Sequence, residues 1–155
     1  MGKVKDVMKR DVITVTRSTN LRELLQKFKD FHTFPLVPVV EEKKLVGVVK
    51  LENICKVFQP KEPEILKTLH FIDERPVNIF EVDTPPEMGY LVLVEDIMDT
   101  RFITVEEEDN LNDALSKMRL NNLIQVPVID KNKNLVGIIG VFDIIKNLFM
   151  ERGII

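Results

Sequence analysis

The chain carries the same sequence pattern twice, with the two copies 90 residues apart. An internal duplication of this kind predicts two copies of one folded unit. In the middle of the pattern the offset drops to 89, so the first copy has one extra residue near Phe34 and Pro35. The matching segments are Val4–Met8 with Val94–Met98, Ile13–Val15 with Ile103–Val105, Asn20-Leu21 with Asn110-Leu111, Val37–Val39 with Val126–Val128, and Leu45–Gly47 with Leu135–Gly137.

Both copies predict the same order of elements: a short strand, a helix, two adjacent strands and a second helix. Asn20 and Glu23 have the spacing of a capping box, and apolar residues at helical spacing follow them. The paired strands are β-branched runs on either side of a charged turn. The first copy is expected to have strands over 12–15, 36–40 and 45–49 and helices from residues 20 and 51, and the second copy to have paired strands over 125–129 and 135–139.

The composition of the 155 residues, 45% apolar and 30% charged, is typical of one compact globular domain. Five of the eight prolines fall within residues 59–93, and proline is unsuited to helix interiors and central strands. We therefore expect repeat 1 over residues 1–58, a connector over 59–93 and repeat 2 over 94–155. Within the connector, residues 64–69 are expected to be helical and residues 90–94 extended.

The net charge of −3 argues against general nucleic-acid binding, which requires a basic surface. Residues 1–58 carry a net charge of +5, so an anionic ligand would be drawn to repeat 1. The longest apolar runs are far shorter than the roughly 20 residues that cross a bilayer, and the first residues do not have the pattern of a secretory signal. We therefore expect a cytoplasmic protein without membrane insertion.

Cys55 is the single cysteine, so it can form no internal disulfide and offers no zinc-type spacing. This usage fits a reducing compartment. Cys55 lies on the apolar stripe of the second predicted helix, which predicts a buried, inert thiol.

The duplicated order of motifs resembles the CBS domain, named for cystathionine β-synthase. The resemblance covers residues 4–58 and 94–150 and rests on Val-x-Asp-Val-Met or its variant, Ile-Thr-Val, an amphipathic helix, Val-Pro-Val, and Leu-Val-Gly followed by a helix. Two such domains in tandem resemble a CBS pair, or Bateman module. The resemblance implies an α+β fold (α/β by some schemes) of two βαββα units related by a pseudo-twofold axis. It also implies a homodimer and a regulatory site for an adenosine-containing ligand between the repeats.

The ligand signature of the CBS family is Gly-h-h-Ser/Thr-x-x-Asp, in which the hydroxyl contacts phosphate and the aspartate binds both ribose hydroxyls. The chemistry is sound, because a carboxylate can accept from two vicinal hydroxyls and a helix N-terminus attracts phosphate. Repeat 2 has Gly140 in place of the hydroxyl and keeps the aspartate. In the family the base lies against the opposite repeat. The resemblance therefore implies a first predicted site of Asp143, Gly140, Ile139, Ile13, Thr14, Phe34 and Pro35.

Repeat 1 departs further from the signature, with Lys50 at the hydroxyl position and Asn53 at the aspartate position. A lysine can meet phosphate as a point charge, whereas asparagine is a weaker, neutral partner for ribose. The resemblance implies a second predicted site of Asn53, Lys50, Val49, Ile103, Thr104 and Ile124.

These residues also have purely structural interpretations. Asp143 can complement the dipole of its helix, Lys50 can be a solvated surface residue, and Thr14 and Thr104 can be ordinary strand residues. His32 and His70 have no second His or Cys at metal-ligand spacing, so we expect no metal site.

The sequence has no Gly-rich phosphate loop and no nucleophile with an assignable base, so we expect no enzyme activity. Three functions remain open. The first is a regulatory module that senses an AMP, ADP, ATP, NAD or S-adenosylmethionine type of ligand, requires no cofactor, and passes a conformational change to an effector protein. The second is an interaction module with degenerate nucleotide sites. The third is the regulatory segment of a larger transporter or enzyme.

Overall fold

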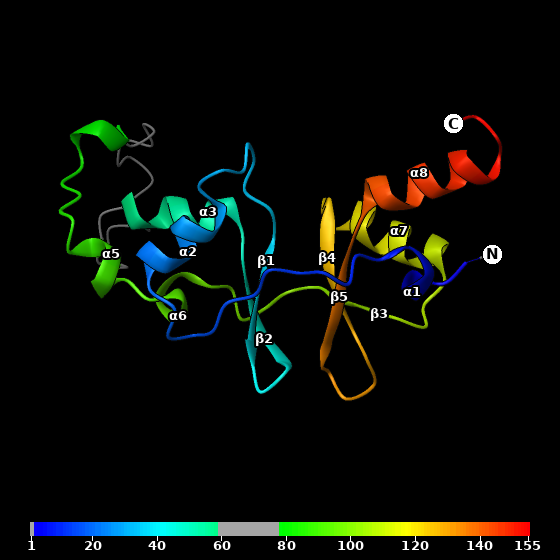
Figure 1. Ribbon diagram of the computed structural model, residues 1–155, viewed down its shortest axis with the longest axis horizontal. Helices are drawn as coiled ribbons and strands as arrows, with labels where there is room; N and C mark the ends of the chain where they lie inside the picture. Colours follow the sequence, from blue (N-terminus) through cyan, green and yellow to red (C-terminus); the bar gives the residue numbers. More distant parts are fainter. Residues whose placement is uncertain (1, 59–77) are drawn as a thin grey trace, which may run out of the picture.

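The computed structural model describes residues 2–58 and 78–155, which form two similar lobes side by side (Figure 1). In each lobe a small sheet lies towards the middle of the molecule, and two helices lie on its outer side. Lobe 1 holds α2 (Leu21–Phe28), β1 (Val37–Glu41), β2 (Lys44–Val49) and α3 (Leu51–Cys55). Lobe 2 holds β3 (Val105–Glu106), α7 (Leu111–Leu120), β4 (Gln125–Ile129), β5 (Leu135–Gly140) and α8 (Val141–Glu151).

The first helix of each lobe begins at the asparagine that the sequence indicates. Asn20 Oδ1 accepts a hydrogen bond from the Glu23 N–H at 2.8 Å, and Asn110 Oδ1 accepts one from the Asp113 N–H at 2.8 Å. Each bond satisfies a backbone donor that the helix itself cannot pair. The residues that these helices bury are Leu21, Leu24 and Phe28 in α2, and Leu111, Ala114 and Met118 in α7.

The two long strands of each lobe form an antiparallel hairpin, as predicted to within one residue at each end. Both hairpins contain an irregularity at an equivalent place, after Val39 in lobe 1 and after Val128 in lobe 2. In lobe 2, β3 adds a parallel strand beside β4. In lobe 1 the strand predicted over residues 12–15 is reduced to a single parallel bridge between Val15 and Val39.

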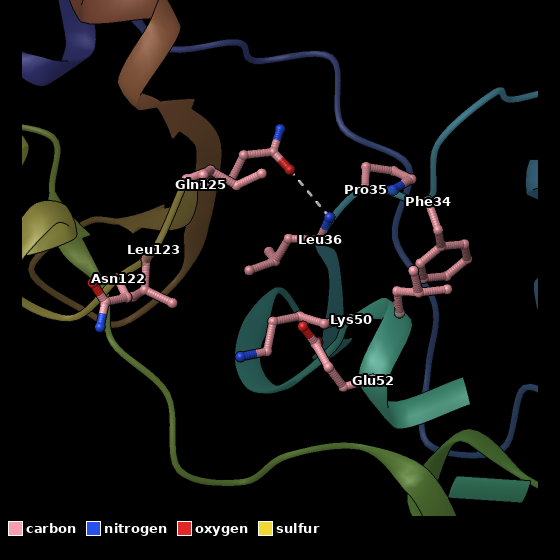
Figure 2. A pocket seen from close by; sticks show the side chains of 10 residues that line it. Phe34, Pro35, Leu36, Lys50, Glu52, Asn122, Leu123 and Gln125 are labelled. Atoms are coloured by element: carbon pink, nitrogen blue, oxygen red, sulfur yellow. Dashed lines mark hydrogen bonds between the residues drawn. The ribbon is translucent and has the colours of Figure 1, made fainter. Parts of the chain in front are cut away.

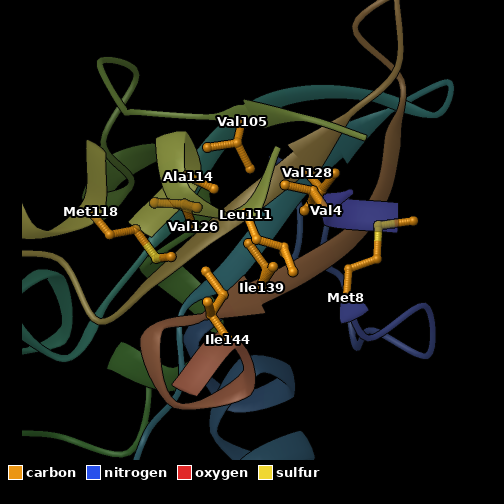
Figure 3. Close-up of a cluster of buried hydrophobic side chains, with 10 residues drawn as sticks. All are labelled: Val4, Met8, Val105, Leu111, Ala114, Met118, Val126, Val128, Ile139 and Ile144. Carbon is orange, nitrogen blue, oxygen red and sulfur yellow. The ribbon is translucent and has the colours of Figure 1, made fainter. Parts of the chain in front are cut away.

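Each lobe is completed by a short segment from the other repeat. α1 (Val4–Val7) packs on lobe 2, and α6 (Val94–Ile97) packs on lobe 1 (Figure 1). Val4 is fully buried among the apolar residues of lobe 2 (Figure 3), and Val94 is fully buried in the core of lobe 1. We call residues 3–9 and 93–99 the exchanged segments.

The aspartate in both copies of the first motif caps an exchanged segment. The Lys3 N–H donates to Asp6 Oδ2 at 2.9 Å, and the Leu93 N–H donates to Asp96 Oδ2 at 2.9 Å. The backbone then attaches to the host lobe at equivalent points, from Val4 N–H to Asp109 O at 2.9 Å and from Val94 N–H to Thr19 O at 2.8 Å.

An ion-pair cluster adds to the attachment of the first exchanged segment. The ammonium groups of Lys3 and Lys5 lie 2.6 and 2.8 Å from the carboxylate of Glu108 in lobe 2. Hydrogen bonds from Lys3 and then Lys5 lower the pKa of Glu108 to about 2. These side chains are exposed to solvent, so the cluster contributes little to stability.

Reciprocal hydrogen bonds between the lobes follow the expected pseudo-twofold axis. The Leu45 N–H donates to Lys133 O at 3.2 Å, and the Leu135 N–H donates to Lys43 O at 2.9 Å. Leu45 corresponds to Leu135 and Lys43 to Lys133, each pair being 90 positions apart, so the two bonds are equivalent under the pseudo-twofold axis. The bridges between Lys9 and Ile138 and between Val48 and Asp99 are related in the same way.

Gly47 and Gly137, the glycines of the Leu-Val-Gly motif, allow the exchanged segments to lie against the hairpins. A Cβ atom at position 137 would lie 2.6 Å from the carbonyl oxygen of Lys9. At position 47 it would lie 2.8 Å from Met98 Sδ and 3.0 Å from the carbonyl oxygen of Asp99. The contact at position 137 involves a backbone atom and is shorter than normal side-chain packing, so repeat 2 requires glycine there. At position 47 the closest atom belongs to a flexible side chain, so the constraint on repeat 1 is weaker.

Two local predictions are wrong. Of residues 90–94, expected to be extended, only Val92 and Leu93 are, because Val94 begins α6 and Tyr90 and Leu91 belong to α5 (Met88–Leu91), which packs against α2 of lobe 1. Cys55, expected to be buried, is exposed. α3 ends at Cys55, and the following 3-10 turn (Lys56–Phe58) has three residues per turn, so the apolar stripe does not continue. The helix predicted over residues 64–69 lies outside the described residues.

Candidate functional site

The two lobes meet at a cleft on the pseudo-twofold axis. Leu36, before β1, and Gln125, at the start of β4, occupy equivalent positions in the two repeats. The Leu36 N–H donates a hydrogen bond to Gln125 Oε1 at 3.2 Å across this cleft (Figure 2). Because leucine has no polar side chain, the bond is formed in one direction only.

Leu36 and Gln125 together separate three cavities of about 230, 160 and 290 Å³, which we call cavity A, cavity B and the central cavity. The other residues of cavity A are Lys9, Asp11, Val12, Ile13, Phe28, Phe31, Pro35 and Ile138. The others of cavity B are Val48, Lys50, Arg101, Phe102, Ile103, Asn121 and Leu123. The others of the central cavity are Phe34, Pro35, Lys50, Leu51, Glu52, Asn122, Leu123 and Ile124.

The sizes of the cavities limit what each can hold. Small-molecule sites usually have volumes of about 300 to 1,000 Å³, and each of the three is below that range. Leu36 and Gln125 line all three cavities, so a ligand larger than one cavity would contact this pair.

The first predicted site is only partly brought together. Ile13 lines cavity A, Phe34 lines the central cavity, and Pro35 lines both. Thr14 lines none of the three cavities. Ile139 is fully buried in the core of lobe 2, away from any ligand.

Gly140 and Asp143 lie at the edge of the cleft without lining these cavities. The Gly140 N–H donates to Asp143 Oδ2 at 2.8 Å, which caps α8. Asp143 Oδ1 accepts no hydrogen bond from the described residues. A Cβ atom at Gly140 would lie 3.3 Å from Asp143 Oδ2 and 3.5 Å from Gln125 Cγ, so the carboxylate stands close to the side chain that divides the cleft.

The second predicted site is also divided. Lys50 lines cavity B and the central cavity, Ile103 lines cavity B, and Ile124 lines the central cavity. Thr104 lines none of them, and Val49 is fully buried in the core of lobe 1. In Figure 2 the amine of Lys50 points away from α3, towards the side of the cleft that carries Asn122 and Leu123.

Asn53 has both side-chain groups engaged. Its Oδ1 accepts from the Lys50 N–H at 2.8 Å, and its Nδ2 donates to the carbonyl oxygen of Ile97 at 2.7 Å. The residue is only 1% exposed and lines none of the three cavities. In this structure it joins α3 to the exchanged segment of repeat 2.

Sequence reasoning missed many residues of the cleft, and three of them differ in charge or polarity from their counterparts in the other repeat: Asp11, Arg101 and Gln125. The repeat alignment contains a signal for each. Asp11 and Arg101 are 90 positions apart and have opposite charges, and Gln125 is polar where repeat 1 has Leu36. A difference between otherwise matching positions would have marked all three.

The described part of the chain has neither a cluster of metal-ligating side chains nor a helix that could span a membrane. Residues 2–58 and 78–155 contain no group of three or more His, Cys, Asp or Glu side chains arranged to hold a metal ion. None of the helices in these ranges has the length and apolar character required to cross a bilayer.

Comparison with known families identifies the duplicated unit. The model of the CBS domain matches residues 4–59 and 94–149, which are most of the chain. The chain belongs to the CBS-domain family. Its two CBS domains form a tandem CBS pair, or Bateman module, with the mixed helix and strand fold expected for one.

A curated relative of this CBS pair is the uncharacterized protein MJ1232 of Methanocaldococcus jannaschii. The two are 29% identical over 144 residues, covering 93% of this chain and 38% of the relative. The chain therefore spans little more than a third of the length of that protein.

Two solved structures have the same fold over nearly the whole chain. The complex of CBSX2 from Arabidopsis thaliana with AMP has a TM-score of 0.69 and 20% identity, covering 97% of this chain and 98% of that one. The CBS domain pair of protein MJ0100, in complex with 5′-methylthioadenosine and S-adenosyl-L-methionine, has a TM-score of 0.65 and 24% identity, with the same coverage. At these identities the likeness establishes the fold.

Proposed function

We propose that this CBS pair is a regulatory module that binds an adenosine-containing ligand in the cleft between its repeats. The cleft at Leu36 and Gln125 carries the proposal, because it is lined from both lobes and a ligand there contacts both. The ligands of the CBSX2 and MJ0100 complexes, which include AMP and S-adenosyl-L-methionine, support this ligand class.

The partition of the cleft suggests how binding produces a signal. A nucleotide would extend over more than one of these small cavities and would contact Leu36 and Gln125, so we expect its binding to separate this pair. This pair links equivalent points of the two lobes, and its opening changes how the lobes sit on each other. A ligand that binds the open form more tightly shifts the equilibrium towards it.

Asp143 is the residue of the first predicted site to which we assign ribose binding. Its Oδ2 is held by the Gly140 N–H, so the carboxylate has a fixed orientation, and its Oδ1 remains an acceptor for ribose hydroxyls. Asn53 has no group left for this role, because both ends of its amide are engaged. The proposal therefore places the ribose on the repeat 2 side of the cleft.

A second candidate is the regulatory segment of a longer protein. The observation that favours it is the length of MJ1232, of which this chain spans 38%. A chain of this type would act on a domain attached to it, whereas an independent CBS pair would act on a separate effector protein. A cytoplasmic location and a homodimer remain part of the proposal.

Thermal unfolding with AMP, ADP, ATP, NAD, 5′-methylthioadenosine and S-adenosylmethionine tests ligand binding. At a concentration 100 times Kd, binding stabilises the folded state by about 2.7 kcal/mol. For a chain of this size this raises the Tm by about 5–10 °C. We expect at least one ligand of the set to produce such a rise.

Variants distinguish a site in the cleft from unspecific stabilisation. Asp143→Ala is expected to abolish the ligand-induced rise, measured against its own ligand-free Tm. Asp113→Ala removes the carboxylate at the matching position of α7, outside the cleft, and is expected to keep the rise. If no ligand of the set raises the Tm at millimolar concentration, or if both variants respond like the unaltered chain, the proposal is wrong.

A further inference from the structure

Cavities A and B occupy equivalent positions on the two sides of the pseudo-twofold axis. Ile13 in cavity A corresponds to Ile103 in cavity B, and Ile138 corresponds to Val48, each pair being 90 residues apart. The two cavities therefore share these apolar positions. Their charged residues differ.

Two equivalent positions place positive charge on cavity B. Arg101 lines cavity B where Asp11 lines cavity A, and Lys50 lines cavity B where the matching residue of repeat 2 is Gly140. Among the residues that the structure describes, no acidic one lines cavity B, whereas cavity A has one lysine, Lys9, and one aspartate, Asp11. Cavity B therefore carries a net positive charge, whereas the positive and negative charges of cavity A cancel.

The cations of cavity B are available to a ligand. Within residues 2–58 and 78–155, neither Lys50 nor Arg101 takes part in an ion pair. Glu52 lines the central cavity and not cavity B, and the carboxylate of Asp99 pairs with Lys56 at 3.5 Å. Two unneutralised cations beside one small cavity create a positive potential that attracts anions.

Cavity A has a different character. Phe28 and Phe31 line it, and their rings pack edge to face with centroids 5.1 Å apart. Asp11 would repel a phosphate group, whereas the aromatic rings offer contact to an uncharged base.

We propose that cavity B is a phosphate receptor in which Arg101 and Lys50 hold the anion, and that cavity A does not accept phosphate. The proposal rests on the proposed function only in taking this phosphate to be part of an adenosine-containing ligand. Arginine provides a planar, two-pronged set of donors for phosphate oxygens, and lysine adds a second charge. Arg101 is thereby the residue that gives phosphorylated ligands a higher affinity than unphosphorylated ones.

Inorganic pyrophosphate tests the receptor without any nucleoside. In ¹H–¹⁵N spectra of the labelled chain, titration with sodium pyrophosphate is expected to shift the amide signals of residues 50 and 101–103. The signals of residues 11–13 are expected to stay in place. Sodium chloride at equal ionic strength serves as the reference.

Variants connect these shifts to the two cations. Lys50→Gln combined with Arg101→Gln is expected to abolish the shifts, and Lys9→Gln, which removes the cation of cavity A, is expected to keep them. The exchange variant Asp11→Arg with Arg101→Asp is expected to move the response to residues 11–13. Equal shifts on both sides, or no shift at 10 mM pyrophosphate (about 10,000 times a micromolar Kd), overturn the proposal.

Calorimetric titration with AMP and with adenosine separates the two proposals. AMP is expected to bind at least about 10-fold more tightly than adenosine, since charge-assisted hydrogen bonds to phosphate are among the strong ones. Arg101→Gln is expected to remove most of this difference and leave adenosine binding unchanged.

The outcomes of the titration are distinct. If AMP and adenosine bind equally and Arg101→Gln changes neither, the phosphate assignment is wrong and the adenosine site stands. If neither binds while pyrophosphate shifts the signals of cavity B, the adenosine proposal is wrong and cavity B stands as an anion receptor.

Discussion

Asn53 donates a hydrogen bond from its Nδ2 to the carbonyl oxygen of Ile97 at 2.7 Å. The two residues come from different repeats, because Asn53 lies in α3 of repeat 1 and Ile97 in α6 of repeat 2. An ionised aspartate in place of Asn53 would have acceptors only and would face the carbonyl oxygen without a proton between them. The asparagine at a signature aspartate position is therefore a structural requirement of lobe 1.

Asn53→Asp is expected to destabilise the protein by about 1–3 kcal/mol at pH 7, because the buried Ile97 carbonyl loses its donor. Urea unfolding followed by circular dichroism measures the change. Asp143→Asn, the matching exchange in repeat 2, keeps an acceptor for the Gly140 N–H and is expected to cost less than about 1 kcal/mol. Equal costs for the two variants would contradict this interpretation of Asn53.

Gly137→Ala is expected to destabilise the protein by about 1–3 kcal/mol, because the new methyl group overlaps the backbone of the first exchanged segment. The obstructing atom is the carbonyl oxygen of Lys9, 2.6 Å from the new Cβ position. Gly47→Ala is expected to cost less, because its closest neighbour is the flexible side chain of Met98, and its nearest backbone atom is 3.0 Å away. Guanidinium unfolding of both variants checks this order, and a larger loss in Gly47→Ala would refute it.

The ion-pair cluster of the first exchanged segment gives stability a dependence on acid pH. The pKa of Glu108 is lowered from 4.5 to about 2 in the folded protein. Its contribution is therefore complete above pH 4.5 and is lost as the pH falls from 4.5 towards 2. Glu108→Gln is expected to be slightly less stable than the unaltered chain at pH 7 and equally stable near pH 2. Thermal unfolding across this range measures the gap, which must also shrink in high salt. A gap that is independent of pH would show that the cluster does not act through charge.

A homodimer is expected to form through the helices of lobe 2. In lobe 1, α5 packs against α2, the helix that corresponds to α7, whereas in lobe 2 Phe142 on α8 is 70% exposed and has further exposed apolar residues, Leu148, Phe149 and Met150, on its helix. Phe142→Glu is expected to convert a dimer to a monomer in light-scattering chromatography. Phe80→Glu serves as the control, because Phe80 is 93% exposed and lies in the connector, away from α8. A monomeric unaltered chain, or a dimer that survives Phe142→Glu, would exclude this surface.

The offset between the matching segments of the two repeats was sufficient to predict the architecture of the fold. The 90-residue offset, the capping residues Asn20 and Asn110, and the two β-branched hairpins are local signals, and each gave its element to within a few residues. The exchange of α1 and α6 between lobes was not predictable in this way. It depends on which core accepts Val4 and Val94, and the pattern of a single segment contains no information about its partner.

The candidate site was predicted less well than the fold for a similar reason. The ligand signature identifies positions along one helix, and it led to Asn53 and Val49, which the structure uses for a buried hydrogen bond and for the core of lobe 1. Cleft residues such as Gln125 and Arg101 come from the facing repeat, and their roles depend on how the lobes meet. The sequence indicates these cleft residues only where the two repeats differ at matching positions. Such differences are seen only when the repeats are aligned and compared residue by residue.

The exchanged segments also determine how the chain can be divided. A fragment with one CBS domain would keep its own exchanged segment, whose apolar residues pack in the missing lobe. Its remaining lobe would lack the exchanged segment that the other repeat supplies. Such a fragment has no complete hydrophobic core of its own. Two separately produced halves could form complete cores only by binding to each other. A single repeat moved into another protein is therefore expected to aggregate, and a graft of this CBS pair must transfer both repeats together.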